Sequence, residues 1–113
     1  MLEEKDNEMY EYLQNDNVEE FNKKRDEGVS VDLSSARFRS FDLRGANLGG
    51  LDLSGAYFKN SDIRGIDLSK TKLAGASIYN AKISGVLFPS HFSPEEITMS
   101  LVYGTRLRVK SSS

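Results

Sequence analysis

Apolar residues recur at every fifth position of this chain, from residue 33 to residue 88. A second, mostly small residue lies two positions before each of them, with a polar residue, often Asp or Asn, in between. A period of five fits neither a helix nor a flat strand. It fits a chain that points two side chains inward and then turns, so we predict twelve consecutive pentads over residues 31–90. Their central residues are Leu33, Phe38, Leu43, Leu48, Leu53, Phe58, Ile63, Leu68, Leu73, Ile78, Ile83 and Phe88.

The last residue of each pentad indicates a turn. Eight of these twelve residues are Gly or Asn, which accept the positive φ that a type II turn requires. The other four predict turns of a different type. They are Ser35, Ser40, Lys70 and Ser90.

Units such as LDLSG and SDIRG resemble the repeat of the pentapeptide-repeat family, A(D/N)LXX. The resemblance implies an all-β solenoid, a right-handed quadrilateral β-helix with four pentads in each coil and hence about three coils. Phe41 and Leu51 depart from the pattern at the normally small position, and the last three units lack the Asp or Asn. The flanking segments EFN…R and EI..S..YGTRLR resemble those of small bacterial members of the family.

Stacking four pentads per coil predicts which residues touch. Phe38, Phe58 and Ile78 should stack, and the oversized Phe41 should lie over the small Ser61. Three coils at a strand spacing of ~4.8 Å give a stack only about 15 Å tall. Both ends of so short a solenoid expose core and unpaired backbone, so we expect a cap at each end.

The segment before the repeat has the features of a helical cap. We predict one helix over residues 4–13, with Met9, Tyr10 and Leu13 on one side. A second helix should follow the N-cap Asn17. We expect its residues Val18 and Phe21 to plug the first coil, Glu20 to complete a capping box, and Gly28 to follow its end near Glu27.

The segment after the repeat begins with a strong helix start at 93–96, Ser-Pro-Glu-Glu. Ile97 and Leu101 share one face of this helix, and Gly104 should end it. Residues 105–109 alternate and predict an extended segment. The chain thus divides into an N-terminal helical cap, the β-helix, and a C-terminal helix with its tail, at residues 1–30, 31–90 and 91–113.

Nothing in the composition indicates an enzyme. The chain of 113 residues has no Cys and a single His, which excludes disulfides, thiolate sites and paired-His chemistry within one chain. Two pairs of carboxylates should stack between coils, Asp42 over Asp62 and Asp32 over Asp52. Arg44 and Arg64 flank the first pair. Both pairs therefore favour a solvated charge ladder over acid–base or metal chemistry. We therefore predict no catalytic residue, no metal and no cofactor.

Charge is distributed unevenly along the chain. Residues 1–30 carry a net charge of −6, residues 31–90 one of +3 and residues 91–113 one of +1. One predicted face of the solenoid combines basic residues with tyrosines and is our candidate partner-binding face. Its residues are Arg37, Arg39, Tyr57, Lys59 and Tyr79.

We therefore expect a non-enzymatic protein-interaction or structural module whose partner the sequence does not name. One alternative, implied by the resemblance, is a DNA mimic that binds and protects DNA gyrase; the positive repeat and the short stack argue against it. The other is weak nucleic-acid binding through the basic face. A homodimer could form at the C-terminal end through Ile97, Leu101 and Leu107. With no signal-like start and no apolar run long enough to span a membrane, we expect a cytoplasmic protein.

Overall fold

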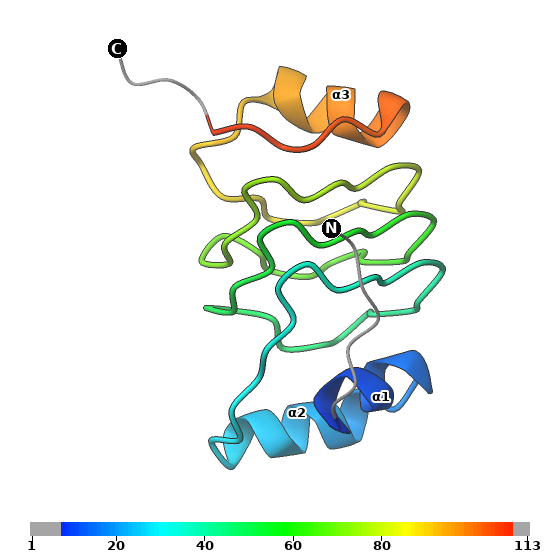
Figure 1. The fold of residues 1–113 in the computed structure, drawn as a ribbon, viewed down its shortest axis with the longest axis vertical. Helices are drawn as coiled ribbons and strands as arrows, with labels where there is room; N and C mark the ends of the chain where they lie inside the picture. The colour runs from blue at the N-terminus through cyan, green and yellow to red at the C-terminus, as the bar shows by residue number, and fades with distance from the viewer. Residues whose placement is uncertain (1–7, 110–113) are drawn as a thin grey trace.

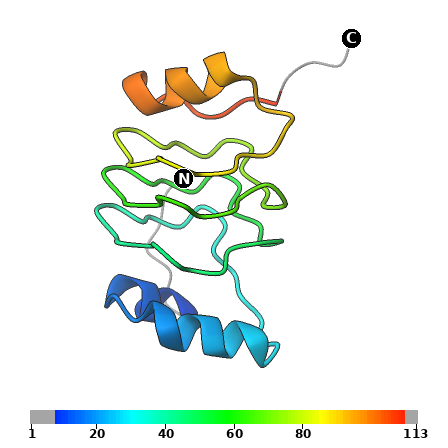
Figure 2. The same cartoon turned by 180° about the vertical axis from the view of Figure 1, so that it is seen from behind.

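The computed structural model describes residues 8–109. Within them, two helices precede the repeat segment and one helix follows it. Helices α1 (Glu8–Gln14) and α2 (Val18–Asp26) lie at one end of the molecule, and α3 (Pro94–Tyr103) lies at the other. Between them the chain winds into stacked coils, which Figures 1 and 2 show from opposite sides. No helix in this described range is long and apolar enough to cross a membrane.

The coils are in register at intervals of twenty residues. Parallel β-bridges join Arg37 to Tyr57 and Tyr57 to Ser77, and equivalent bridges join Asp42, Asp62 and Lys82. Within residues 8–109 these are isolated bridges and not continuous strands. The register defines a first, second and third coil over residues 31–50, 51–70 and 71–90, and it aligns the pentads in four columns. The second column consists of residues 36–40, 56–60 and 76–80, and the third of residues 41–45, 61–65 and 81–85.

A turn closes every pentad from the first to the eleventh. In the first, the Ala36 N–H donates to the Leu33 carbonyl at 3.2 Å, and the same bond recurs every five residues as far as Val86. Most of these turns have positive φ at their third residue, as in a type II turn. Lys70 stays outside the positive-φ region, as predicted for it.

The prediction of a different turn was wrong for Ser35 and Ser40. Both have positive φ, 56° and 62°. Their N–H groups donate to carbonyls of the next coil, that of Ser35 to Ser54 at 2.9 Å and that of Ser40 to Lys59 at 2.8 Å. The ladder between coils therefore imposes the turn, although a side chain at positive φ costs about 1 kcal/mol.

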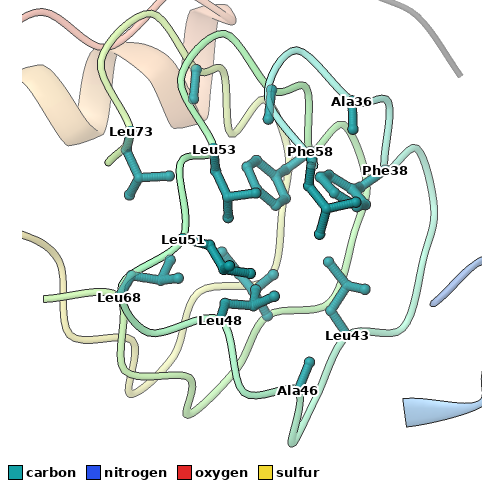
Figure 3. Close-up of a cluster of buried hydrophobic side chains, with 14 of the residues drawn as sticks. Ala36, Phe38, Leu43, Ala46, Leu48, Leu51, Leu53, Phe58, Leu68 and Leu73 are labelled. Atoms are coloured by element: carbon teal, nitrogen blue, oxygen red, sulfur yellow. The ribbon is translucent and has the colours of Figure 1, made fainter. Parts of the chain in front are cut away.

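The central residues of the first ten pentads fill the interior of the coils (Figure 3), whereas Ile83 and Phe88 of the last two are half-buried. Phe38 and Phe58 stack with ring centroids 5.0 Å apart and planes 19° apart, as the register predicted. Phe41 is half-buried, and Ser61, one coil above it, is fully buried with its hydroxyl donating to the Phe58 carbonyl at 2.8 Å. The small residue thus makes room for the large one without leaving a buried hydroxyl unpaired.

Helices α1 and α2 close the first coil. Met9, Tyr10 and Leu13 of α1 and Phe21 of α2 are buried in the core. Helix α1 ends one residue later than predicted, and the predicted residues 4–7 lie outside the described part of the chain. At the start of α2 the Asn17 side chain accepts from the Glu20 N–H at 3.3 Å, which confirms the predicted N-cap.

Two polar side chains of α2 fasten it to the edge of the first coil. The Asn22 amide donates to the Gly45 carbonyl at 2.9 Å and accepts from the Asn47 N–H at 2.7 Å. Arg25 donates to the carbonyls of Asn47 at 3.1 Å and Gly49 at 2.6 Å. The EFN…R segment is therefore a capping device that satisfies backbone groups left open by the first coil.

Helix α3 and the segment after it close the third coil. Ser93 caps the start of α3 by accepting from the Glu96 N–H at 3.1 Å, and Gly104, at φ 76°, caps its end. The chain then runs extended beneath α3, where Leu107 exchanges backbone hydrogen bonds of 2.8 and 2.7 Å with Gly75 and Ala76. The predicted extended segment is thus confirmed as part of the cap.

Candidate interaction face

The structure places all five predicted partner-binding residues on the second column. Arg37 and Arg39 lie on the first coil, Tyr57 and Lys59 on the second, and Tyr79 on the third. Each flanks a buried central residue of its pentad; Arg37, Arg39 and Tyr79 are exposed, and the other two are half-buried. The five-residue period, with the four pentads per coil that the family resemblance implies, thus identified residues that share one column.

Tyr79 on this face is held in place by its neighbours. The Lys59 ammonium lies 5.8 Å from the centroid of the Tyr79 ring, within cation–π range. A Cβ at Gly104 would lie only 3.3 Å from Cγ of Tyr79, so this ring packs directly against the end of α3. Tyr57 is half-buried. The Tyr79 ring is therefore held between Lys59 and the end of α3.

The second column has no acidic residue, whereas each of the other three contains at least one Asp. Among the residues that the structure describes, Arg37, Arg39 and Lys59 form no salt bridge. Three positive charges on this face are thus left without a carboxylate partner.

The third column shows the opposite arrangement. Nη2 of Arg44 lies 2.8 Å from Oδ2 of Asp42, and its Nε lies 3.3 Å from Oδ2 of Asp62. Nη2 of Arg64 lies 2.7 Å from the same Oδ2 of Asp62. The hydrogen bond from Arg64 lowers the pKa of Asp62 to about 2, and that from Arg44 lowers the pKa of Asp42. The two carboxylates therefore remain ionised and paired, which is the charge ladder predicted for them.

A hollow of about 320 Å³, here called the notch, lies where α1 meets the second column. Its lining residues are Tyr10, Gln14, Arg37, Arg39 and Phe41. The Tyr10 hydroxyl donates to the Arg37 carbonyl at 2.6 Å and so ties α1 to the first coil. Sequence reasoning missed the contribution of α1, because no repeat or spacing links Tyr10 or Gln14 to residues more than twenty positions away.

A second hollow, of about 300 Å³, contains the only histidine. His91 lines it beside Lys70 and Lys72, but the Thr71 hydroxyl is already bonded to the Leu48 carbonyl at 2.9 Å. No group of three or more potential metal ligands occurs within residues 8–109. This hollow therefore offers no organised set of ligands.

The residues predicted for self-association are largely buried within the chain. Leu107 is 1% exposed, and Ile97 and Leu101 are half-buried against the core. They are needed within the chain, because α3 and residues 105–109 must cover the third coil. The large apolar residues exposed on α3 are instead Met99, Val102 and Tyr103, and association of two copies at this end stays a prediction.

Comparison with known proteins agrees with the repeat. The family model described as pentapeptide repeats matches residues 32–69 and 52–88, with eight copies, so that residues 32–88, just over half of the chain, are covered. No curated protein and no solved structure matched the chain. The match falls on the coils described above and on neither cap. The chain belongs to the pentapeptide-repeat family.

Proposed function

We propose that this chain is a non-enzymatic protein-interaction module whose second column is the face that contacts a protein partner. The observation that carries the proposal is the group of three basic residues without a carboxylate partner beside two tyrosines on that column, with the Tyr79 ring packed against the end of α3. Tyr and Arg are enriched in protein interfaces, because each combines a large contact area with hydrogen-bond donors. A rigid scaffold adds affinity, since little conformational entropy is lost on binding.

The scaffold of this proposal is a right-handed quadrilateral β-helix. The twenty-residue register, the turn in each of the first eleven pentads and membership of the family support it. Parallel coils that share one backbone ladder present outward side chains at fixed intervals of ~4.8 Å. The second column would therefore act as a flat face with three rows.

Site-specific photo-cross-linking in cells of the source organism tests the proposal. A photoreactive residue at Lys59 on the second column should trap a discrete protein, whereas the same residue at Lys82 on the third column should not. Lys82 carries the same charge and is exposed on the third column, so it serves as the control. The proposal is wrong if both positions trap the same set of proteins at similar yield.

The salt dependence of the affinity distinguishes this function from nucleic-acid binding. Three basic residues on the face would give a nucleic-acid affinity that falls steeply as salt is added, because counterion release drives it. A protein complex that also buries Tyr57 and Tyr79 should largely survive the same increase. The DNA-mimic alternative has its own assay: the chain should leave gyrase supercoiling unprotected, because its repeat is net positive.

A further inference from the structure

We infer that the notch between α1 and the second column binds the carboxylates of an acidic, extended peptide segment. The inference rests on the proposed function, because the segment would belong to the protein partner. It adds the chemistry of the group that the partner presents and the place on the face where that group binds.

The spacing of the two arginines suits alternate residues of an extended chain. Arg37 and Arg39 are both exposed on either side of the buried Phe38. Residues two apart in an extended chain are separated by about 6.6 Å. Two acidic residues in alternate positions of a bound segment would therefore each meet one guanidinium, and Arg–carboxylate pairs are among the stronger polar contacts.

The walls of the notch suit the aliphatic part of a Glu side chain. The rings of Tyr10 and Phe41 form its apolar side, with centroids 5.6 Å apart, and the Gln14 amide stands at the end of α1. The methylenes of a Glu could pack on the rings while its carboxylate reaches Arg37 or Arg39.

The rim of the notch also offers backbone groups. In the second coil the Tyr57 N–H donates to the Ala36 carbonyl at 2.9 Å, and the Lys59 carbonyl accepts from the Ser40 N–H at 2.8 Å. The equivalent groups of the first coil, the Arg37 N–H and the Arg39 carbonyl, have no hydrogen-bond partner among residues 8–109. They can pair with the main chain of a bound segment, as in strand addition to an open edge.

The test is a titration of the full chain with a fluorescein-labelled peptide of four Glu-Thr repeats, followed by fluorescence anisotropy. We expect saturable binding, and we expect R37Q/R39Q to raise the dissociation constant at least about tenfold. The double variant K23Q/K70Q removes the same net charge from two exposed sites outside the notch and should change the constant less than about twofold. Equal weakening by both pairs would overturn the inference.

Two further probes test the specificity of the notch. A peptide of equal charge with its Glu residues in adjacent pairs should bind more weakly, because only one of each pair can face the arginines. A single-stranded oligonucleotide of equal charge should compete poorly, and tighter binding of the oligonucleotide than of the peptide would overturn the inference. If neither peptide binds but Lys59 still traps a protein, the notch inference fails while the proposed function stands.

Discussion

The two ends of the second column are closed in different ways. At the C-terminal end the main chain of the third coil is bonded to the cap: the Ile78 N–H donates to the Ser100 hydroxyl at 3.0 Å and the Asn80 N–H to the Leu101 carbonyl at 2.9 Å. With Leu107 paired to the neighbouring Gly75 and Ala76, the cap follows this edge closely.

At the N-terminal end the cap is mainly a plug of side chains. Phe21 is 0% exposed under the first coil, and along the second column the Tyr10 hydroxyl bonds the Arg37 carbonyl. The Arg37 N–H and the Arg39 carbonyl are left without a partner in the described chain. The difference indicates that the cap closes the C-terminal edge of this column, whereas the N-terminal edge leaves backbone and charge available for binding.

Removing the plug should have the largest effect. Phe21→Ala deletes a fully buried ring at the N-terminal end and should lower the free energy of unfolding by about 3–5 kcal/mol in urea titrations. Val18→Ala in the same helix is the control, because Val18 is only half-buried and should cost clearly less. If the two variants cost the same, the N-terminal cap does not work as a plug.

Breaking the bonded edge at the other end should cost less. Ser100→Ala removes the acceptor of the buried Ile78 N–H and should destabilise the chain by about 1–3 kcal/mol. Hydrogen exchange of the Ile78 amide should accelerate more than that of amides in the first coil. Thr98→Ala, exposed on the same helix, should stay within about 0.5 kcal/mol of the parent.

The end of α3 should respond to any side chain at Gly104. Gly104→Ala forces a non-glycine residue to φ 76° and brings its Cβ to 3.3 Å from Tyr79, so we expect a loss of about 1–2 kcal/mol. Gly49→Ala should be nearly neutral, because Gly49 lacks a positive φ and its nearest atom, Oδ1 of Asn47, is 3.7 Å away. Thermal unfolding of the pair measures the difference, and equal melting temperatures would contradict this account.

The smallest effect concerns pH at the C-terminal cap. Arg108 donates to both carboxylate oxygens of Glu96 at 3.1 Å, which lowers the pKa of Glu96 below its usual range. A lowered pKa in the folded state gives a stabilisation that is present above the unfolded-state pKa and is lost as the pH falls through the folded-state value. The melting temperature should therefore fall less between pH 5 and pH 3 in Glu96→Gln than in the parent chain, and parallel curves would exclude this role for Glu96.

Much of this architecture follows from local patterns. The five-residue period identified the buried central residues, because each pentad makes the same choice of inward side chains. The contact of Phe38 with Phe58 followed once four pentads per coil were taken from the family resemblance. The helix signals at Asn17, Ser93 and Gly104 depend only on nearby residues and were confirmed. The match to the family covers the same repeat.

What could not be predicted depends on contacts between distant segments. The positive φ of Ser35 and Ser40 comes from bonds to the next coil and not from their own preference. Leu107 became core because residues 105–109 pair with the third coil. Tyr10 and Gln14 joined the notch only through the docking of α1. None of these contacts has a period or a motif of its own.

The twenty-residue register restricts how chains of this kind can change in length. Inserting a whole coil would move the two caps apart by ~4.8 Å and leave each above the same column. Inserting a single pentad between Asn80 and α3 would advance α3 by a quarter of a coil, so that Ser100 and Leu101 would meet residues other than Ile78 and Asn80. Growth by duplication should therefore be tolerated in steps of twenty residues, while a step of five at this end would require a new cap.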